Sequence, residues 1–246
     1  ERGLESKPGP TVREPHEPNT ARRRGPERLR SPLSTGAGDY KPSLRLRVRM
    51  DASSLESRLR DDYETELSRL GSSKWLYALT GGDLDEGSIR SAAATDLDRA
   101  AATFDGWADG GEVFAAAAES AAAARDGIDA DPTDTDRPLY DAVAGDDEVS
   151  RLGALLGWSV VADKTLSQMV GFFVGDASPA AADTFRSIRD DVAADREAAL
   201  DALDEACASD DDWDRAVASA SAVVEAAYDE YVAKLEAMGI KPKNVC

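Results

Sequence analysis

The stretch RLGALLGWSVVADKTLSQMVGFFVG, residues 151–175, decides the fold class of this chain. Drawn as a helix, it places apolar side chains on almost every side, and a helix of that kind is usually buried at the centre of a protein. Gly153 and Gly157 lie about one turn apart and leave a smooth patch where a second helix can approach closely. We therefore predict a long central helix, from about Asp147 to Val174, surrounded by other helices.

The segments on both sides of this helix are amphipathic, with apolar residues at helical spacing and no convincing strand pattern. Ser53 with Glu56, and Asp83 with Glu86, have the spacing of capping boxes and predict two helix starts. Short loops between long amphipathic helices imply an antiparallel bundle, so the fold is expected to be all-α. The other helices are expected at residues 53–70, 74–79, 83–107, 112–126, 139–143, 179–208 and 211–238.

Charge is distributed unevenly along the chain. Residues 1–49 hold 12 Lys and Arg against 6 Asp and Glu, which leaves 17 against 42 in residues 50–246, a net charge of −25. Such self-repulsion weakens a compact fold in dilute buffer but is tolerated in molar salt, where the Debye length is about 3 Å. The composition, with abundant Asp and Ala and little Lys, resembles that of haloarchaeal proteins. This resemblance implies that potassium and sodium ions balance the negative charge. The alternative is an ordinary acidic protein with a partner-binding surface.

The first 49 residues differ in character from the rest. They carry seven of the eleven prolines and show no helical or strand period, so a disordered basic segment is expected over 1–49. The first methionine is Met50, and the regular pattern begins directly after it. One interpretation is that 1–49 lie upstream of the true start at Met50, and the alternative is a basic arm for nucleic acid. Residues 50–246 are expected to form a single α-helical domain.

Several chemistries lack the residues they need. No apolar stretch reaches 18 residues and no secretory signal appears, so we expect a cytoplasmic protein with no membrane partner. Cys207 and Cys246 form neither a disulfide framework nor a metal spacing. His16 is the only histidine, so residues 17–246 contain no His-ligated metal site and no His-dependent triad.

Two acidic residues fall on the apolar stripes. Asp163 continues the inward series of the central helix, and Asp195 follows Ile188 and Val192 at helical spacing. An unpaired buried carboxylate is costly, so each needs a cationic partner, a metal or a raised pKa. Lys164 or an arginine would give Asp163 a structural ion pair, and the alternative is a functional site.

Three motifs resemble ferritin-like, rubrerythrin-type proteins of haloarchaea. They are KWLYALTGG at 74–82, TDLDRAAATFDGW at 95–107 and GALLGWSVVADKTLSQMVGFFVGD at 153–176, and the likeness covers roughly residues 53–208. The resemblance implies an antiparallel ferritin-like four-helix bundle, with a core at about 84–208 and additional N- and C-terminal helices. It also implies a carboxylate on each of two helices and Glu-x-x-His on each of the other two. Carried over, these ligand positions fall on Asp96, Glu119, Asp163 and Asp195.

The departures from this pattern change the expected function. Both histidine positions are alanine, Ala122 and Ala198, and three of the four carboxylates are the shorter Asp. Iron of this type needs imidazole as well as carboxylate ligands. We therefore expect a bundle with no catalytic, cofactor-binding or metal residues, acting through assembly with itself or through binding another protein.

Two other functions remain open at this stage. The first is a metal-dependent oxidoreductase that holds iron or manganese with the four carboxylates alone. The second is a transcription regulator, because some haloarchaeal proteins to which the chain is similar carry the label transcription antitermination protein. A net charge of −25 in residues 50–246 repels phosphate, so nucleic acid is not the expected partner.

Overall fold

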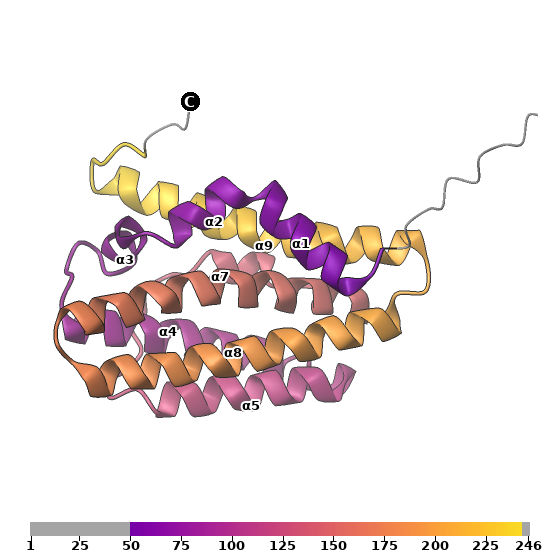
Figure 1. The fold of residues 1–246 in the computed structure, drawn as a ribbon, viewed down its shortest axis with the longest axis horizontal. Coiled ribbons are helices and arrows are strands. Elements are labelled where there is room, and N and C mark those ends of the chain that lie inside the picture. Colours follow the sequence, from indigo (N-terminus) through magenta and orange to yellow (C-terminus); the bar gives the residue numbers. More distant parts are fainter. Residues whose placement is uncertain (1–49, 243–246) are drawn as a thin grey trace, which may run out of the picture. The chain divides into compact units, whose positions relative to one another are not determined.

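The computed structural model describes residues 50–242, and this part of the chain is all-α (Figure 1). The predictions about residues 1–49 and about Cys246 lie outside it. The helices are α1 (Ala52–Asp62), α2 (Glu64–Leu70), α3 (Ser73–Leu79), α4 (Glu86–Asp105), α5 (Glu112–Asp126), α6 (Leu139–Ala142), α7 (Glu148–Gly175), α8 (Pro179–Ala206) and α9 (Asp210–Ala237). A single 3-10 turn, η1 (Ala108–Gly110), joins α4 to α5.

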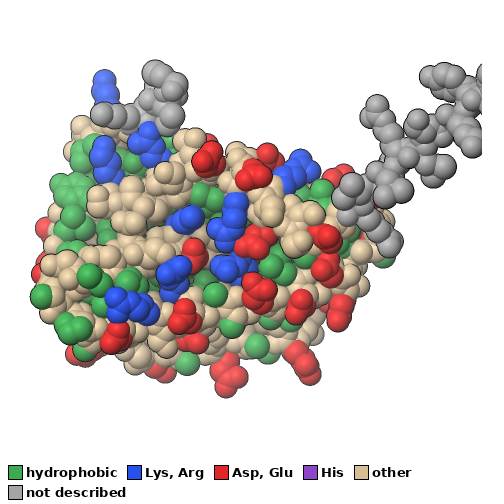
Figure 2. Space-filling model, in the orientation of Figure 1, with side chains coloured by type: hydrophobic (Ala, Val, Ile, Leu, Met, Phe, Trp, Pro, Cys, Tyr) green, Lys and Arg blue, Asp and Glu red, His purple; other side chains and the backbone are tan. Residues whose placement is uncertain are grey.

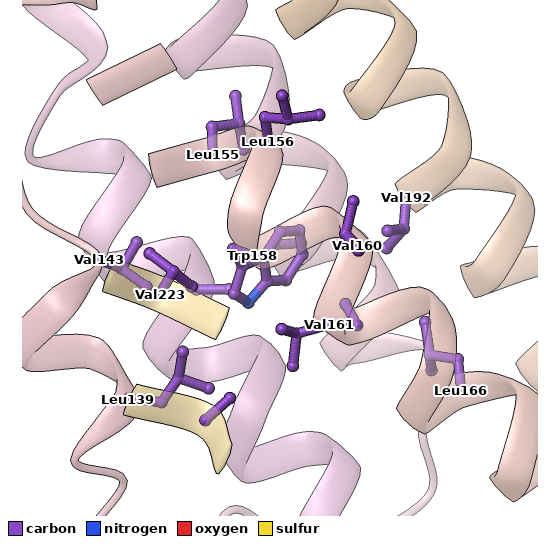
Figure 3. Packing of buried hydrophobic residues seen from close by; sticks show 14 of the residues in the cluster. Leu139, Val143, Leu155, Leu156, Trp158, Val160, Val161, Leu166, Val192 and Val223 are labelled. Atoms are coloured by element: carbon purple, nitrogen blue, oxygen red, sulfur yellow. The ribbon is translucent and has the colours of Figure 1, made fainter. Parts of the chain in front are cut away.

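The predicted central helix is confirmed as α7. It packs most extensively against α8 and α9 and also touches α2 and α3. Its side chains are buried on nearly all sides, and Figure 3 shows Leu155, Trp158 and Val161 within the apolar core. The four tryptophans of the chain are all buried, as expected of core residues. The burial of this helix follows from its sequence, since any exposed face would leave apolar area in water.

The smooth patch on α7 receives α9. A β-carbon built on Gly153 would lie 2.4 Å from the carbonyl oxygen of Ala216, and one on Gly157 would lie 2.6 Å from that of Ala220. Both distances are far below ordinary van der Waals contact, so the two backbones touch directly. The sequence predicted this close approach, and the structure identifies α9 as the helix that makes it.

The long helices form two antiparallel pairs and an added layer. The pairs are α4 with α5 and α7 with α8, and α5 also packs against α8. Residues 127–147 connect the pairs and run back along the bundle, so that α5 and α7 point the same way (Figure 1). The last helix, α9, lies on the other side of α7, and α1, α2 and α3 pack on it.

Three helices begin with the same local signal, Asp-x-x-Ser. Asp51, Asp85 and Asp147 each accept a hydrogen bond from the backbone N–H of the serine three residues later, at 2.8 to 2.9 Å. These caps satisfy backbone donors that the first turn leaves unpaired.

The expected capping boxes at Ser53 and Asp83 were therefore wrong by two residues each: Asp51, two residues before Ser53, caps α1, and Asp85, two residues after Asp83, caps α4. The expected helix 53–70 is also interrupted at Tyr63, which separates α1 from α2. No helix of the described residues combines the length and apolar character needed to span a membrane.

Candidate functional site

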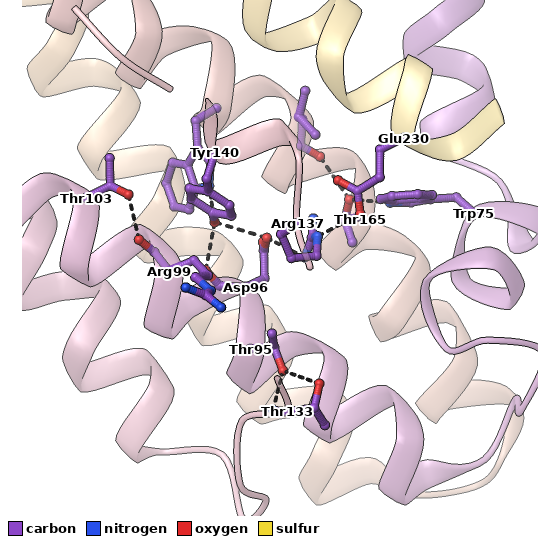
Figure 4. Close-up of polar contacts among 12 residues, drawn as sticks. Trp75, Thr95, Asp96, Arg99, Thr103, Thr133, Arg137, Tyr140, Thr165 and Glu230 are labelled. Carbon is purple, nitrogen blue, oxygen red and sulfur yellow. Dashed lines mark hydrogen bonds and ion pairs between the residues drawn. The ribbon is translucent and has the colours of Figure 1, made fainter. Parts of the chain in front are cut away.

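A buried polar network lies where the connection 127–147 passes between α4 and α9 (Figure 4). Its centre is Arg137, which is 6 % exposed. The guanidinium Nη1 lies 2.7 Å from Oδ1 of Asp96 on α4, and Nε donates to Oε1 of Glu230 on α9 at 2.9 Å. One cation therefore links two helices that are distant in sequence.

Aromatic side chains close the network toward the bundle interior. The hydroxyl of Tyr140 donates to the backbone oxygen of Asp96 at 2.7 Å and lies 3.0 Å from its Oδ1. The indole N–H of Trp158 on α7 donates to the same hydroxyl at 3.0 Å. Burial raises the pKa of Tyr140 well above its usual value, and the Asp96 carboxylate adds to the effect. Tyr140 therefore stays neutral and holds α4, α6 and α7 together through hydrogen bonds.

The charges of the network balance. Lys234, one turn after Glu230, places its Nζ 3.6 Å from Oε1, so two cations face two carboxylates. Burial by itself lowers the pKa of Arg137, but the two carboxylates outweigh burial and raise it above the ordinary value. Glu230 is only 3 % exposed, and its Oε2 has no hydrogen-bond partner among the described residues. A buried carboxylate in this position depends on Arg137 for its stability.

Asp96 is the one predicted ligand position that the network uses. Its side chain is 16 % exposed, and its carboxylate already faces a guanidinium. In the carried-over pattern a metal ion would supply the positive charge at this carboxylate. Here Arg137 supplies it.

The other three predicted positions lie elsewhere. Asp163 is mostly buried and pairs with Arg189 of α8 at 2.8 Å, which is the structural ion pair that the sequence allowed, with an arginine in place of Lys164. Glu119 is exposed on α5, and its half-buried neighbour Ser120 forms a hydrogen bond with Asp195 of α8 instead. Glu119, the position that the resemblance implied on this helix, is therefore not on the side of α5 that meets Asp195.

Asp195 lies on α8, opposite α5. Burial raises the pKa of its carboxyl to about 6, although a hydrogen bond with Ser120 of α5 acts in the opposite direction. In the part of the chain that the structure describes, no three His, Cys, Asp or Glu side chains gather closely enough to hold a metal ion. The four carboxylates are thus not brought together as an all-carboxylate site.

The interior between α4, α7 and α8 is apolar and nearly full. The space there has a volume of about 10 Å³, and it is lined mainly by Leu97, Trp158, Leu166, Met169 and Val192, with Asp96 at its edge. A water molecule needs roughly 10 to 15 Å³ and several polar partners. The residues present do not fit a di-iron centre, which needs room for two ions, their ligands and an oxidant.

A larger cleft opens beside the network. It has a volume of about 700 Å³ between the loop before α4, the start of α4, the connection 127–147 and the end of α9. Arg137, Lys234 and one acid, Asp85, line it together with hydroxyl groups and a few apolar side chains. Thr95 and Thr133 fix the connection to α4, since the backbone N–H of Thr133 donates to the Thr95 hydroxyl at 2.8 Å. A polar group of a ligand could therefore bind in this cleft, next to the ion pairs of Arg137 and Lys234.

Sequence reasoning missed Arg137, Tyr140 and Glu230. Glu230 had a detectable signal, because it continues the buried series of Val223 and Ala227 at helical spacing and is the acidic member of that stripe. Arg137 and Tyr140 had none, since they lie in or beside a polar connection whose path depends on the packing of α4 and α9. No protein-family model, no curated protein and no solved structure matches this chain.

Proposed function

We propose that this chain is a non-catalytic, metal-free ferritin-like bundle that acts by binding a partner or by assembling with itself. One observation carries the proposal: the Arg137 guanidinium lies 2.7 Å from the Asp96 carboxylate and provides the charge that a metal ion would provide. The interior beside it holds about 10 Å³, too little for a di-metal centre. The stability of the bundle then depends on an ion pair and on packing.

The arrangement of the helices supports the ferritin-like part of the proposal. Such bundles join two antiparallel helix pairs by one long crossover connection. Here α4 with α5 and α7 with α8 are the pairs, and residues 127–147 run the length of the bundle between them. The helices α1, α2, α3 and α9 lie outside these two pairs, as additional N- and C-terminal helices of such a bundle would.

If this chain binds a partner protein, its cleft of about 700 Å³ could hold a polar group of that partner. Its volume is within the range of about 300 to 1,000 Å³ that is usual for ligand sites. The salt-rich cytoplasm inferred from composition is part of the same proposal, because the net charge of −25 in residues 50–246 is tolerated best where salt screens it.

Metal analysis tests the proposal directly. Protein purified in molar potassium chloride, equilibrated with iron(II) or manganese(II) without oxygen and then freed of unbound metal by gel filtration in the same salt should retain far less than one ion per chain. Two tightly held ions per chain, lost in Asp163→Ala but kept in Asp183→Ala, would overturn it. Asp183 is the matched control, because it is an exposed aspartate that pairs with Arg186 of its own helix.

A further inference from the structure

Several Lys and Arg side chains lie close together on one face of residues 50–242. Figure 2 shows Lys and Arg side chains in the middle of this face, over α2, α7 and α8, with Asp and Glu mostly around them. The cations there include Arg60, Lys164, Arg189 and Arg196. Residues 50–246 have a net charge of −25, so a cluster of cations differs in sign from the charge of this part of the chain as a whole.

The cations on this face outnumber the carboxylates with which they form ion pairs. Arg60 and Arg196 share one carboxylate, that of Glu56, with nitrogen–oxygen distances of 2.8 and 3.2 Å. Arg189 is paired with Asp163. No carboxylate among residues 50–242 pairs with Lys164, whose aliphatic stem lies beside Gly71 at the end of α2. The surplus is therefore Lys164, which has no such partner, and one of the two arginines that share Glu56.

A groove of about 420 Å³ lies at this surplus, between α1 and α2 on one side and α7 on the other. Arg60 and Lys164 line it and bring charge, and Ser68, Ser167 and Gln168 bring neutral hydrogen-bond donors. Leu67, Gly71 and one exposed acid, Glu64, complete the lining. The lining has a formal charge of +1, from Arg60 and Lys164 against Glu64, and its serine and glutamine side chains can donate hydrogen bonds to an anion.

From this lining we infer that the groove binds the phosphate group of a small phosphate monoester. A phosphate dianion offers several acceptor oxygens to several donors, whereas a carboxylate offers only two. The volume of about 420 Å³ is within the usual range for small-molecule sites and leaves room for the organic part of an ester. In molar salt the Debye length is about 3 Å, so the attraction of a phosphate depends on the charges of the groove itself and little on the net charge of the whole domain.

Phosphorus-31 line broadening tests this inference, with inorganic phosphate and phenyl phosphate as probes and acetate as the carboxylate comparison. The folded chain is used at the lowest potassium chloride concentration that keeps its full helical circular dichroism signal. Both phosphate probes should bind, phenyl phosphate more tightly, and acetate measured by proton line broadening should not. Lys164→Gln should weaken phosphate binding about tenfold, the usual effect of losing one charged hydrogen bond. Ser167→Ala should weaken it by a smaller factor.

Lys74→Gln is the matched control, because Lys74 is an exposed lysine of α3 outside the groove. It removes the same charge and should leave binding unchanged. The inference is overturned if wild type shows no phosphate binding at 10 mM probe, roughly the weak limit for a specific site. It is also overturned if acetate binds equally well, or if Lys164→Gln and Lys74→Gln weaken binding alike, which would mean diffuse attraction of anions. None of these results bears on metal content, so the phosphate-binding inference and the proposal of a metal-free bundle can be refuted independently.

Discussion

Replacing Gly157 by alanine should destabilise the fold, although alanine is the better helix former. The added methyl group would lie 2.6 Å from the carbonyl oxygen of Ala220, whereas ordinary contact begins at 3.4 Å. The nearest atoms are all backbone atoms of α9, so no side chain can rotate away, and the helices must separate by about 0.8 Å.

The size of the effect follows from two opposing contributions. Forcing an extra methyl group into a tight interface costs about 1 to 3 kcal/mol. The change from glycine to alanine inside a helix returns about 1 kcal/mol. Because rigid backbone faces the new group, the cost falls near its upper limit, and the net loss is about 1 to 2 kcal/mol. For a domain of this size that lowers the melting temperature by roughly 2 to 8 °C.

Gly171 gives a control in the same helix. A β-carbon there meets nothing within 4 Å, so Gly171→Ala should gain up to about 1 kcal/mol from helix propensity alone. Thermal unfolding followed by circular dichroism in molar potassium chloride compares the two variants. If Gly157→Ala melts as high as Gly171→Ala, then α7 and α9 do not touch at this point and the packing described here is incorrect.

Two further predictions concern buried charge. Arg137→Met should cost about 3 to 5 kcal/mol of unfolding free energy, because it leaves the carboxylates of Asp96 and Glu230 without their shared cation. The exposed pair partner Arg58, changed to Met, should cost less than about 1 kcal/mol in the same urea titration, and equal losses would contradict the network. Asp195 has a folded-state pKa of about 6, raised by burial, so its folded form holds a proton that the unfolded form releases above pH 3.8. Stability from this group is therefore present at pH 4 and lost as the pH rises to 6. Asp195→Asn should stabilise the chain at pH 7 by about 1 to 2 kcal/mol, after allowance for solvent screening, and by little at pH 4. A gain that is the same at both pH values would argue against the raised pKa.

Much of the secondary structure could be predicted from local patterns. The central helix, the α5 segment and the short turn at 139–142 agree with the expected ranges within one or two residues. Apolar periodicity determined them, and periodicity is a property of neighbouring residues. Two helix starts were predicted less well, because the caps at Asp51 and Asp85 compete with capping-box patterns at Ser53 and Asp83.

The candidate site was predictable only in part. The sequence placed Asp96 on a helix and Asp163 on the inner stripe, and it allowed an ion pair for Asp163. It did not place Ser120, rather than Glu119, opposite Asp195, because the rotation of α5 is set by how its alanine face packs against α4 and α8.

By itself, the sequence determined that the chain forms helices, that the most apolar of them is central, and that no histidine is present in residues 17–246 to ligate a metal. Only the tertiary structure decided which charges meet. Asp96, Arg137 and Glu230 belong to three separate segments, and their contact depends on the path of the connection 127–147 between α4 and α9. The physical reason is that helix periodicity is a short-range property, whereas a buried ion pair is fixed by the packing of elements that are far apart in the chain.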